Sequence, residues 1–147
     1  MTLFLEKVGT FYAPAFSKEK NICGGKIMKR IPIILDGDPG HDDAIAWVLA
    51  KGSPMLDIRG VTSVCGNQTI EKTTYNAQRI CTLIDLHVPT AMGRIRPLIS
   101  DPIIAPTVHG ESGLDGPALP EPDFELEDMD AVTLMAKLIQ ESDEPIT

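Results

Sequence analysis

The stretch Asp36-Gly37-Asp38-Pro39-Gly40-His41-Asp42-Asp43 decides the expected fold of this chain. It follows the apolar run Ile-Pro-Ile-Ile-Leu at 31–35 and precedes residues 44–50, which are typical of a helix. The Pro-Gly pair inside it turns the chain between the two. We expect Asp42 or Asp43 to cap the helix, because the positive end of the helix dipole stabilises a carboxylate. The sequence therefore predicts a strand, a tight acidic turn and a helix.

The four carboxylates of this turn repel one another, and the sequence allows two ways to tolerate that repulsion. One is full solvation, since Asp and Gly are ordinary turn residues and one of the acids can cap the helix. The other is a hard cation bound by several carboxylate oxygens. In open α/β sheets, ligands bind outside the carboxyl ends of the strands, where this turn is expected to lie. Four acids at these spacings favour the metal site.

The rest of the chain predicts a Rossmann-like α/β fold, with a mostly parallel sheet and flanking helices. The nearly continuous apolar run at 31–35 is typical of a central strand buried on both faces. The further expected elements are a helix at 42–51 with Ile45, Val48 and Leu49 on one face, a strand at 56–64, a helix at 69–86, a short strand at 88–93, a helix capped by Asp130, and the entry to a fourth strand at 144–147. Because a domain rarely ends on the first residues of a buried strand, we expect the domain to be truncated.

Two later segments carry further candidate site residues. The second strand ends in Cys65-Gly66-Asn67-Gln68-Thr69, which we expect on the same sheet edge as the acidic turn if both strands are parallel. Asn67 has both a donor and an acceptor, which suits a sugar hydroxyl, although alone it is also an ordinary turn residue. Residues 94–128 form a long irregular region, and loops of this length are usually functional or disordered. His109 in this region is a candidate substrate contact.

Ser112, in Gly110-Glu111-Ser112-Gly113, superficially resembles a nucleophile elbow. That motif needs a strand before it and a helix after it, and the Gly-Pro pair at 116–117 argues against the helix. We therefore reject a serine hydrolase.

Composition narrows the possible partners. A chain of 147 residues suits one domain, and its net charge of -8 argues against a nucleic-acid backbone as partner. The three cysteines form no C-x-x-C pair, which argues against a disulfide framework or a zinc site and fits a reducing cytoplasm. No apolar run is long enough to cross a membrane.

Three segments together resemble a known family. Residues 36–44, in the pattern Asp-x-Asp-Pro-Gly-x-Asp-Asp-Ala, are similar to the N-terminal signature of the inosine-uridine-preferring nucleoside hydrolases. Residues 66–69 and 109–116 match further family segments in the expected order. The Gly-Leu-Asp-Gly-Pro continuation at 113–117 is most similar to the bacterial pyrimidine-specific ribonucleoside hydrolases. Family members are normally much longer than the matching region, so the resemblance implies the N-terminal part of such a domain, over residues 30–147.

The resemblance implies hydrolysis of the N-glycosidic bond of a ribonucleoside, uridine or cytidine in particular, with one bound Ca²⁺. Carried over by position, Asp38 and Asp43 are metal ligands, and Asp38 is also the general base for the water beside the cation. Asp42 and Asn67 contact the ribose, and His109 lies near the base. We expect Asp36 to support the turn. The family also implies a homo-oligomer, a dimer or tetramer, in the full-length form.

Residues 1–29 are expected to lie outside the domain, because family members usually begin just before the first strand, as if at Met28. The codons required by Gly24-Gly25-Lys26-Ile27-Met28 can spell a ribosome-binding site before a start codon. We therefore hypothesise that residues 1–27 are upstream sequence, and a genuine N-terminal arm is the alternative.

Two other functions remain open. Asp36-x-Asp38 after an apolar strand is also the opening of haloacid-dehalogenase-like phosphatases, in which the first Asp is the nucleophile and Mg²⁺ is bound. That reading gives no reason for Asp42, Asp43, Asn67 or the loop around His109. The other alternative is an inactive, truncated remnant, because the remaining calcium ligands and the histidine that serves the leaving base normally come from the second half of the family's domain.

Overall fold

The computed structural model describes residues 22–23, 26–27, 29–116 and 118–147. At its centre is a parallel sheet in the order β3–β4–β5, formed by β3 (Ile31–Gly37), β4 (Leu56–Ser63) and β5 (Thr90–Met92). Since the strands run in the same direction, the carboxyl ends of all three lie at one edge of the sheet. The predicted parallel sheet is confirmed.

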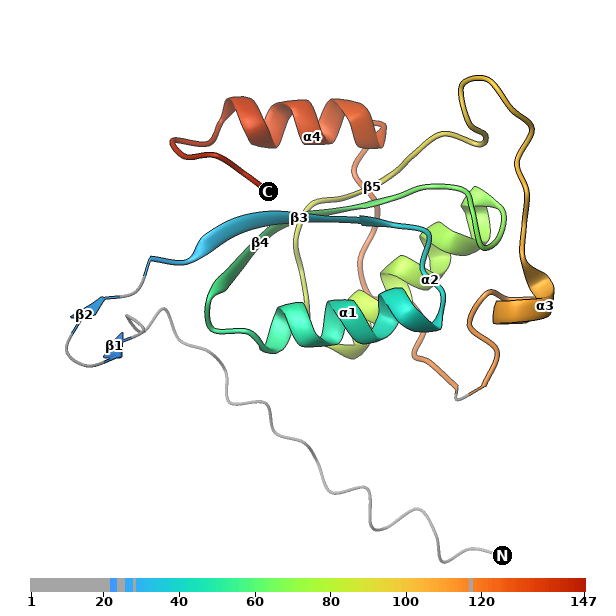
Figure 1. The fold of residues 1–147 in the computed structure, drawn as a ribbon, viewed down its shortest axis with the longest axis horizontal. Helices are drawn as coiled ribbons and strands as arrows, with labels where there is room; N and C mark the ends of the chain where they lie inside the picture. Colours follow the sequence, from blue (N-terminus) through green and yellow to red (C-terminus); the bar gives the residue numbers. More distant parts are fainter. Residues whose placement is uncertain (1–21, 24–25, 28, 117) are drawn as a thin grey trace, which may run out of the picture.

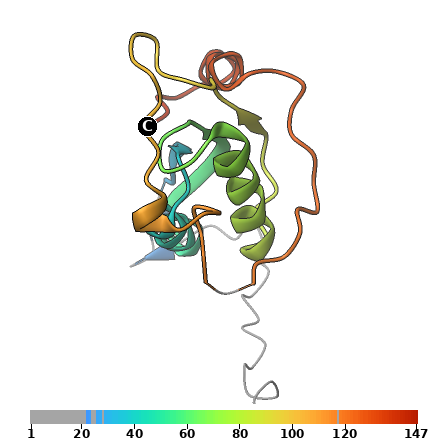
Figure 2. The ribbon, with the colours of Figure 1, turned by 90° about the vertical axis from the view of Figure 1, so that its right-hand side faces the viewer.

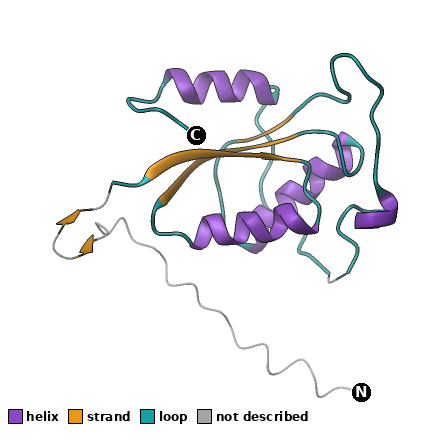
Figure 3. Cartoon of the chain, in the orientation of Figure 1, coloured by secondary structure: helices purple, strands orange, loops and turns teal. Residues whose placement is uncertain are grey.

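Helices cover both faces of this sheet. Helices α1 (His41–Gly52) and α2 (Ile70–Leu83) lie on one face, and α4 (Ala131–Gln140) lies on the other, as Figures 1 and 2 show. The long connection between β5 and α4 is irregular apart from the one-turn helix α3 (Pro106–His109), which the sequence did not predict (Figure 3). The layers are those of a Rossmann-like α/β fold, as expected.

The start and the buried face of α1 differ from the predictions. Gly40 is the N-cap, with extended backbone, and the N–H of Ala44 donates to its carbonyl at 3.1 Å. The prediction that Asp42 or Asp43 caps the helix is therefore wrong, because the turn ends two residues earlier than expected. Both acids lie in the first turn of the helix, close to the positive end of its dipole.

Trp47 is the buried side chain of α1, with 3% of its surface exposed. It packs in a core that includes Val61 of β4 and Ala77 and Ile80 of α2. The three residues expected on the core face of α1 are instead 64%, 47% and 69% exposed; they are Ile45, Val48 and Leu49. The helix is thus rotated so that its one aromatic ring, which has the largest apolar surface, is buried against the sheet.

The C-terminal residue Thr147 pairs with β3. The N–H of Thr147 donates to the carbonyl of Pro32 at 3.0 Å, and the N–H of Ile34 donates to the carbonyl of Thr147 at 2.9 Å. This is the bonding pattern of a parallel pair on the free side of β3. The expected strand entry at 144–147 is therefore seen as the pairing of this one residue with β3.

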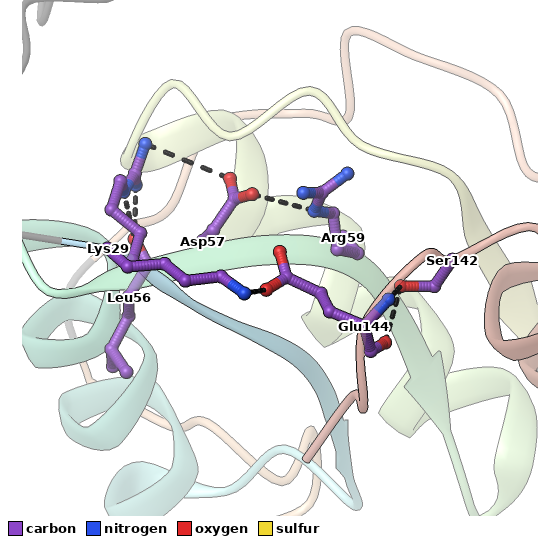
Figure 4. Close-up of polar contacts among 7 residues, drawn as sticks. Lys29, Leu56, Asp57, Arg59, Ser142 and Glu144 are labelled. Carbon is purple, nitrogen blue, oxygen red and sulfur yellow. Dashed lines mark hydrogen bonds and ion pairs between the residues drawn. The ribbon is translucent and has the colours of Figure 1, made fainter.

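Polar contacts fix the segment that leads to this pairing, as Figure 4 shows. Lys29 forms an ion pair with Glu144, and the hydroxyl of Ser142 donates to the carbonyl of Glu144 at 2.6 Å. On β4, Arg59 and Asp57 form a second ion pair at 2.7 Å. Because these pairs are partly exposed to solvent, each contributes little to the stability of the fold.

Two short strands are described in the N-terminal part of the chain. Strands β1 (Ile22–Cys23) and β2 (Lys26–Ile27) pair only with each other and form a two-stranded antiparallel ladder apart from the main sheet. The remainder of 1–28 lies outside the described residues, so the division between an extension at 1–29 and a domain at 30–147 stays a prediction. Within the described residues, no helix is both long and apolar enough to span a membrane.

Asp130 caps α4, as predicted, and its carboxylate accepts a hydrogen bond from the N–H of Thr133 at 2.8 Å. This hydrogen bond lowers the pKa of Asp130 below its ordinary value of 3.8. Because the folded state then favours the charged form, Asp130 stabilises the fold above pH 3.8, and that stability is lost as the pH falls through its lowered pKa. We expect Asp130→Asn to melt below the wild type at neutral pH and to match it in strong acid. An unchanged difference in melting temperature across this range contradicts the prediction.

Candidate functional site

The candidate site lies at the carboxyl edge of the sheet, where three segments meet. The acidic turn follows β3, and residues 64–69 follow β4. The two turns are joined by a hydrogen bond from the N–H of Val64 to the carbonyl of Gly37, at 2.8 Å. The third segment is the loop at 106–116, anchored near the second turn by a bond from the N–H of Ala105 to the carbonyl of Asn67, at 3.0 Å. All three segments lie outside the carboxyl ends of the strands, where open α/β sheets bind their ligands.

Asp38 and Asn67 hold each other in place. The backbone N–H of Asn67 donates to Oδ2 of Asp38 at 2.7 Å, and the side-chain amide of Asn67 donates to the carbonyl of Asp38 at 2.9 Å. Both side chains are half-buried. Among the described residues, Oδ1 of Asp38 accepts no hydrogen bond, so this oxygen is available to a ligand. The sequence analysis placed these two residues on the same edge, and the structure brings them into contact.

His109 lies at the end of α3 and against the acidic turn. A Cβ on Gly40 would lie 2.6 Å from Nδ1 of His109 and 2.8 Å from the side-chain nitrogen of Asn67, so the three residues meet in a space that only glycine leaves free. The backbone N–H of His41 donates to Nδ1 of His109 at 3.5 Å, a long hydrogen bond. The two imidazole rings stack, with centroids 5.7 Å apart.

The other acids of the turn have different surroundings. Asp36 accepts a hydrogen bond from the hydroxyl of Thr62 at 2.7 Å and so ties β3 to β4. Asp42 is exposed. Partial burial, and then the negative charges of Asp38 and Asp42, raise the pKa of Asp43. No lysine or arginine of the described chain forms an ion pair with Asp38, Asp42 or Asp43. The turn thus concentrates negative charge without a cationic partner.

The carboxylates of the turn are the right type of ligand for a hard cation, but they are too few to complete its coordination. Carboxylate oxygens are the ligands that Ca²⁺ prefers, and mutual repulsion at Asp38 and Asp43 is what such an ion relieves. Ca²⁺ takes six to eight oxygen ligands. Within the described ranges, however, no group of three or more His, Cys, Asp or Glu side chains converges closely enough to hold a metal ion. The described residues therefore offer oxygen ligands of the kind that Ca²⁺ prefers, but not a complete ligand set.

Asp115 organises the loop after His109, a role that the sequence analysis missed. Its carboxylate accepts hydrogen bonds from the N–H groups of Glu111 and Ser112, both at 3.0 Å, and from the hydroxyl of Ser112. These bonds, that of the hydroxyl first, lower the pKa of Asp115. Gly110 has a φ of +80°, and a Cβ there would lie 2.2 Å from the Asp115 carboxyl group. Ser112 is thus part of a turn, in agreement with the rejection of a nucleophile elbow.

Gly66 provides the space that Asp38 occupies, and this allows a direct test of the site's packing. A Cβ on Gly66 would lie 2.1 Å from Oδ2 of Asp38. We expect Gly66→Ala to displace the Asp38 carboxylate and to lower the free energy of unfolding by about 1–3 kcal/mol. Gly52→Ala is the matched control, because a Cβ there meets nothing within 4 Å. Urea denaturation measures both variants, and equal midpoints for the two variants contradict the prediction.

Comparison with known proteins identifies relatives of the whole described domain. Residues 33–147 match the model of the family described as "Inosine-uridine preferring nucleoside hydrolase". The chain is 58% identical over 118 residues to the "Pyrimidine-specific ribonucleoside hydrolase RihA" of Escherichia coli and to that of Escherichia fergusonii. In each case the match covers 80% of this chain and 38% of the relative, so the chain spans well under half the length of these curated relatives.

Solved structures match the same region. An "Inosine-Guanosine Nucleoside Hydrolase (IG-NH)" has a TM-score of 0.73 at 24% identity and shares the fold, over 80% of this chain and 38% of that one. The "Plant nucleoside hydrolase - PpNRh1 enzyme" has a TM-score of 0.70 at 30% identity, over 79% and 37%. A "Purine-Preferring Ribonucleoside Hydrolase from Gardnerella vaginalis" has a TM-score of 0.69 at 28% identity, over 75% and 36%.

Proposed function

Because this chain belongs to the inosine-uridine preferring nucleoside hydrolase family, we propose that its protein hydrolyses the N-glycosidic bond of ribonucleosides, with uridine and cytidine preferred. The observation that carries the proposal is the contact of Asp38 with Asn67 beside His109, at the carboxyl edge of the sheet. The pyrimidine preference rests on the relatives named for it at 58% identity.

In this proposal Asp38 is the general base. Its Oδ1 accepts a proton from the attacking water. The backbone N–H of Asn67 holds the carboxylate through Oδ2, and the Asn67 side chain holds the backbone carbonyl of Asp38. Departure of the nucleobase leaves a positively charged, oxocarbenium-like ribosyl centre. The carboxylates of the turn stabilise that charge. Asn67 and Asp42 bind ribose hydroxyls. His109, which lies against the acidic turn, is placed beside the nucleobase.

Ca²⁺ is the cofactor of this proposal, with Asp38 and Asp43 among its ligands. When bound, the ion would position the attacking water and lower its pKa. The support is the unpaired negative charge of the turn and the raised pKa of Asp43. Asp36 has a supporting role, because its carboxylate is already bonded to Thr62.

The assembly and location are proposed as well. We propose a homo-oligomer, a dimer or tetramer, in the cytoplasm. The exposed apolar side chains of α1, such as Ile45 and Leu49, support association, and the free thiols of Cys65 and Cys81 support a reducing compartment. Light scattering of the purified protein and cell fractionation test the two statements.

A substrate assay tests the proposed function. The protein extended to the length of its curated relatives is incubated with Ca²⁺ and separately with uridine, cytidine, inosine and a phosphomonoester. We expect ribose from the two pyrimidine nucleosides faster than from inosine, and no phosphate. Release of phosphate alone supports the haloacid-dehalogenase-like alternative, and release of neither product supports an inactive remnant.

A further inference from the structure

Three successive carbonyl groups of the His109 loop are bound by three side chains on one face of a single helical segment. Gln68 donates to the carbonyl of Gly110 at 3.0 Å, Lys72 donates to that of Glu111, and Asn76 donates to that of Ser112 at 2.8 Å. Gln68 lies just before α2, and the other two lie on its first turns, so the spacing of four residues places all three side chains on one face. We call Gln68, Lys72 and Asn76 the carbonyl clamp.

Two of the three clamp side chains are buried and closely packed. Gln68 and Asn76 are each 1% exposed, although both are polar. Gly113 has a φ of +83°, and a Cβ there would lie 3.0 Å from the side-chain nitrogen of Asn76 and 3.1 Å from Cγ of Gln68. A buried amide costs free energy unless it is hydrogen-bonded, so these side chains favour one position of the loop.

Asn76 reaches the acidic turn as well as the loop. Its side-chain nitrogen also donates to the carbonyl of Pro39, at 3.3 Å. One buried amide group therefore bonds to the segment that carries Asp38 and to the segment that carries His109. His41 adds a contact from α1, because its Nε2 lies 2.9 Å from the carbonyl of Asp115.

We propose that Asn76 is a positioning residue, which, with the rest of the carbonyl clamp, sets His109 against the acidic turn. The clamp itself follows from these contacts; its importance for catalysis rests on the proposed function. Asn76 does not reach the reacting atoms in this proposal and acts through the loop that it holds.

The test uses the chain of residues 1–147 and does not depend on activity. Asn76→Leu keeps the approximate shape of the side chain and removes both donated hydrogen bonds. Two readouts follow the loop: the hydrogen-exchange rates of the Gly113 and Asp115 amides, which bond to carbonyls within the loop, and the nuclear Overhauser contacts between the stacked rings of His41 and His109. We expect about tenfold faster exchange, which corresponds to the loss of the one hydrogen bond that Asn76 donates to the loop, and loss of the ring contacts.

Gln78→Leu is the matched control. Gln78 lies on the same helix and also donates to a loop carbonyl, that of Phe124, at 3.0 Å, away from the site. The Gln78→Leu variant should leave both readouts unchanged, although it should lower the free energy of unfolding about as much as Asn76→Leu does. Lys72→Met removes one hydrogen bond to a loop carbonyl and a longer one, of 3.3 Å, to Oε1 of Gln68. It should accelerate exchange in the same amides by a smaller factor, and it covers the case in which Asn76→Leu fails to fold. The proposal is overturned if Gln78→Leu accelerates amide exchange as much as the clamp variants do. It is also overturned if the ring contacts stay intact in both Asn76→Leu and Lys72→Met.

Discussion

Replacing Asp38 by asparagine is expected to lower the rate of ribose release from uridine by about 10²- to 10⁴-fold in the protein extended to the length of its relatives, which is the usual cost of losing a general base. Asparagine keeps the shape of the side chain and can still meet the N–H of Asn67, which is 2.7 Å from the carboxylate in the structure. It cannot accept the proton of the attacking water. The substitution also removes one anionic ligand of the proposed cation, which adds to the loss of rate.

Asp36→Asn is the matched control for this substitution. It makes the same chemical change two residues earlier, at a carboxylate that bonds to the hydroxyl of Thr62 on the neighbouring strand. An amide oxygen can accept the same hydrogen bond, so the rate should fall far less. The phosphatase alternative makes Asp36 the nucleophile and predicts the opposite order. If Asp36→Asn abolishes turnover while Asp38→Asn stays near the wild-type rate, the assignment of the turn is wrong.

Local patterns in the sequence were enough to predict most elements of the fold. The apolar run at 31–35 with its Pro-Gly turn gave β3, and the strand ending before Asn67 gave β4 beside it. Because parallel strands place their carboxyl ends together, the nearness of Asp38 and Asn67 could also be predicted. Their two hydrogen bonds could not, since these depend on the absence of a side chain at Gly66.

The orientation of α1 was not predictable from periodicity, because seven of its residues in succession are apolar. Several faces of such a helix satisfy a 3.6-residue period, and only packing against the sheet selects the face of Trp47. The Asp130 cap was predictable, because its carboxylate acts within its own helix end.

The carbonyl clamp shows a second limit of sequence reasoning. Gln68, Lys72 and Asn76 recur every four residues, but a polar stripe of this kind usually marks a solvated helix face. Their acceptors are backbone carbonyls about forty residues later in the chain. Every residue has such a carbonyl, so the sequence does not indicate which ones will accept these hydrogen bonds. His109 likewise could be placed near the acidic turn only through the family resemblance, because 68 residues separate it from His41.

Asp43→Asn is expected to have opposite effects on the stability of the calcium-free chain and on calcium binding. The carboxylate of Asp43 is partly buried beside those of Asp38 and Asp42, and these surroundings raise its pKa, so its charged form is disfavoured in the fold. Removing the charge should raise the free energy of unfolding without metal, by no more than about 1 kcal/mol because the group remains partly in contact with solvent. The same change removes one of the two proposed ligands.

Calcium affinity gives the second half of this prediction. With only part of a ligand set in the described residues, the chain of residues 1–147 should bind Ca²⁺ weakly, with a Kd roughly in the millimolar range, and Asp43→Asn should bind it more weakly still. Calorimetry and thermal melts with and without Ca²⁺ measure both effects. Asp101→Asn is the control, since it removes the same charge from an exposed position outside the turn. A cation site requires carboxylates that lower the stability of the fold when no cation is bound. If Asp43→Asn is less stable than the wild type without calcium, this account of the turn is wrong. Tight, stoichiometric calcium binding by residues 1–147 also contradicts it.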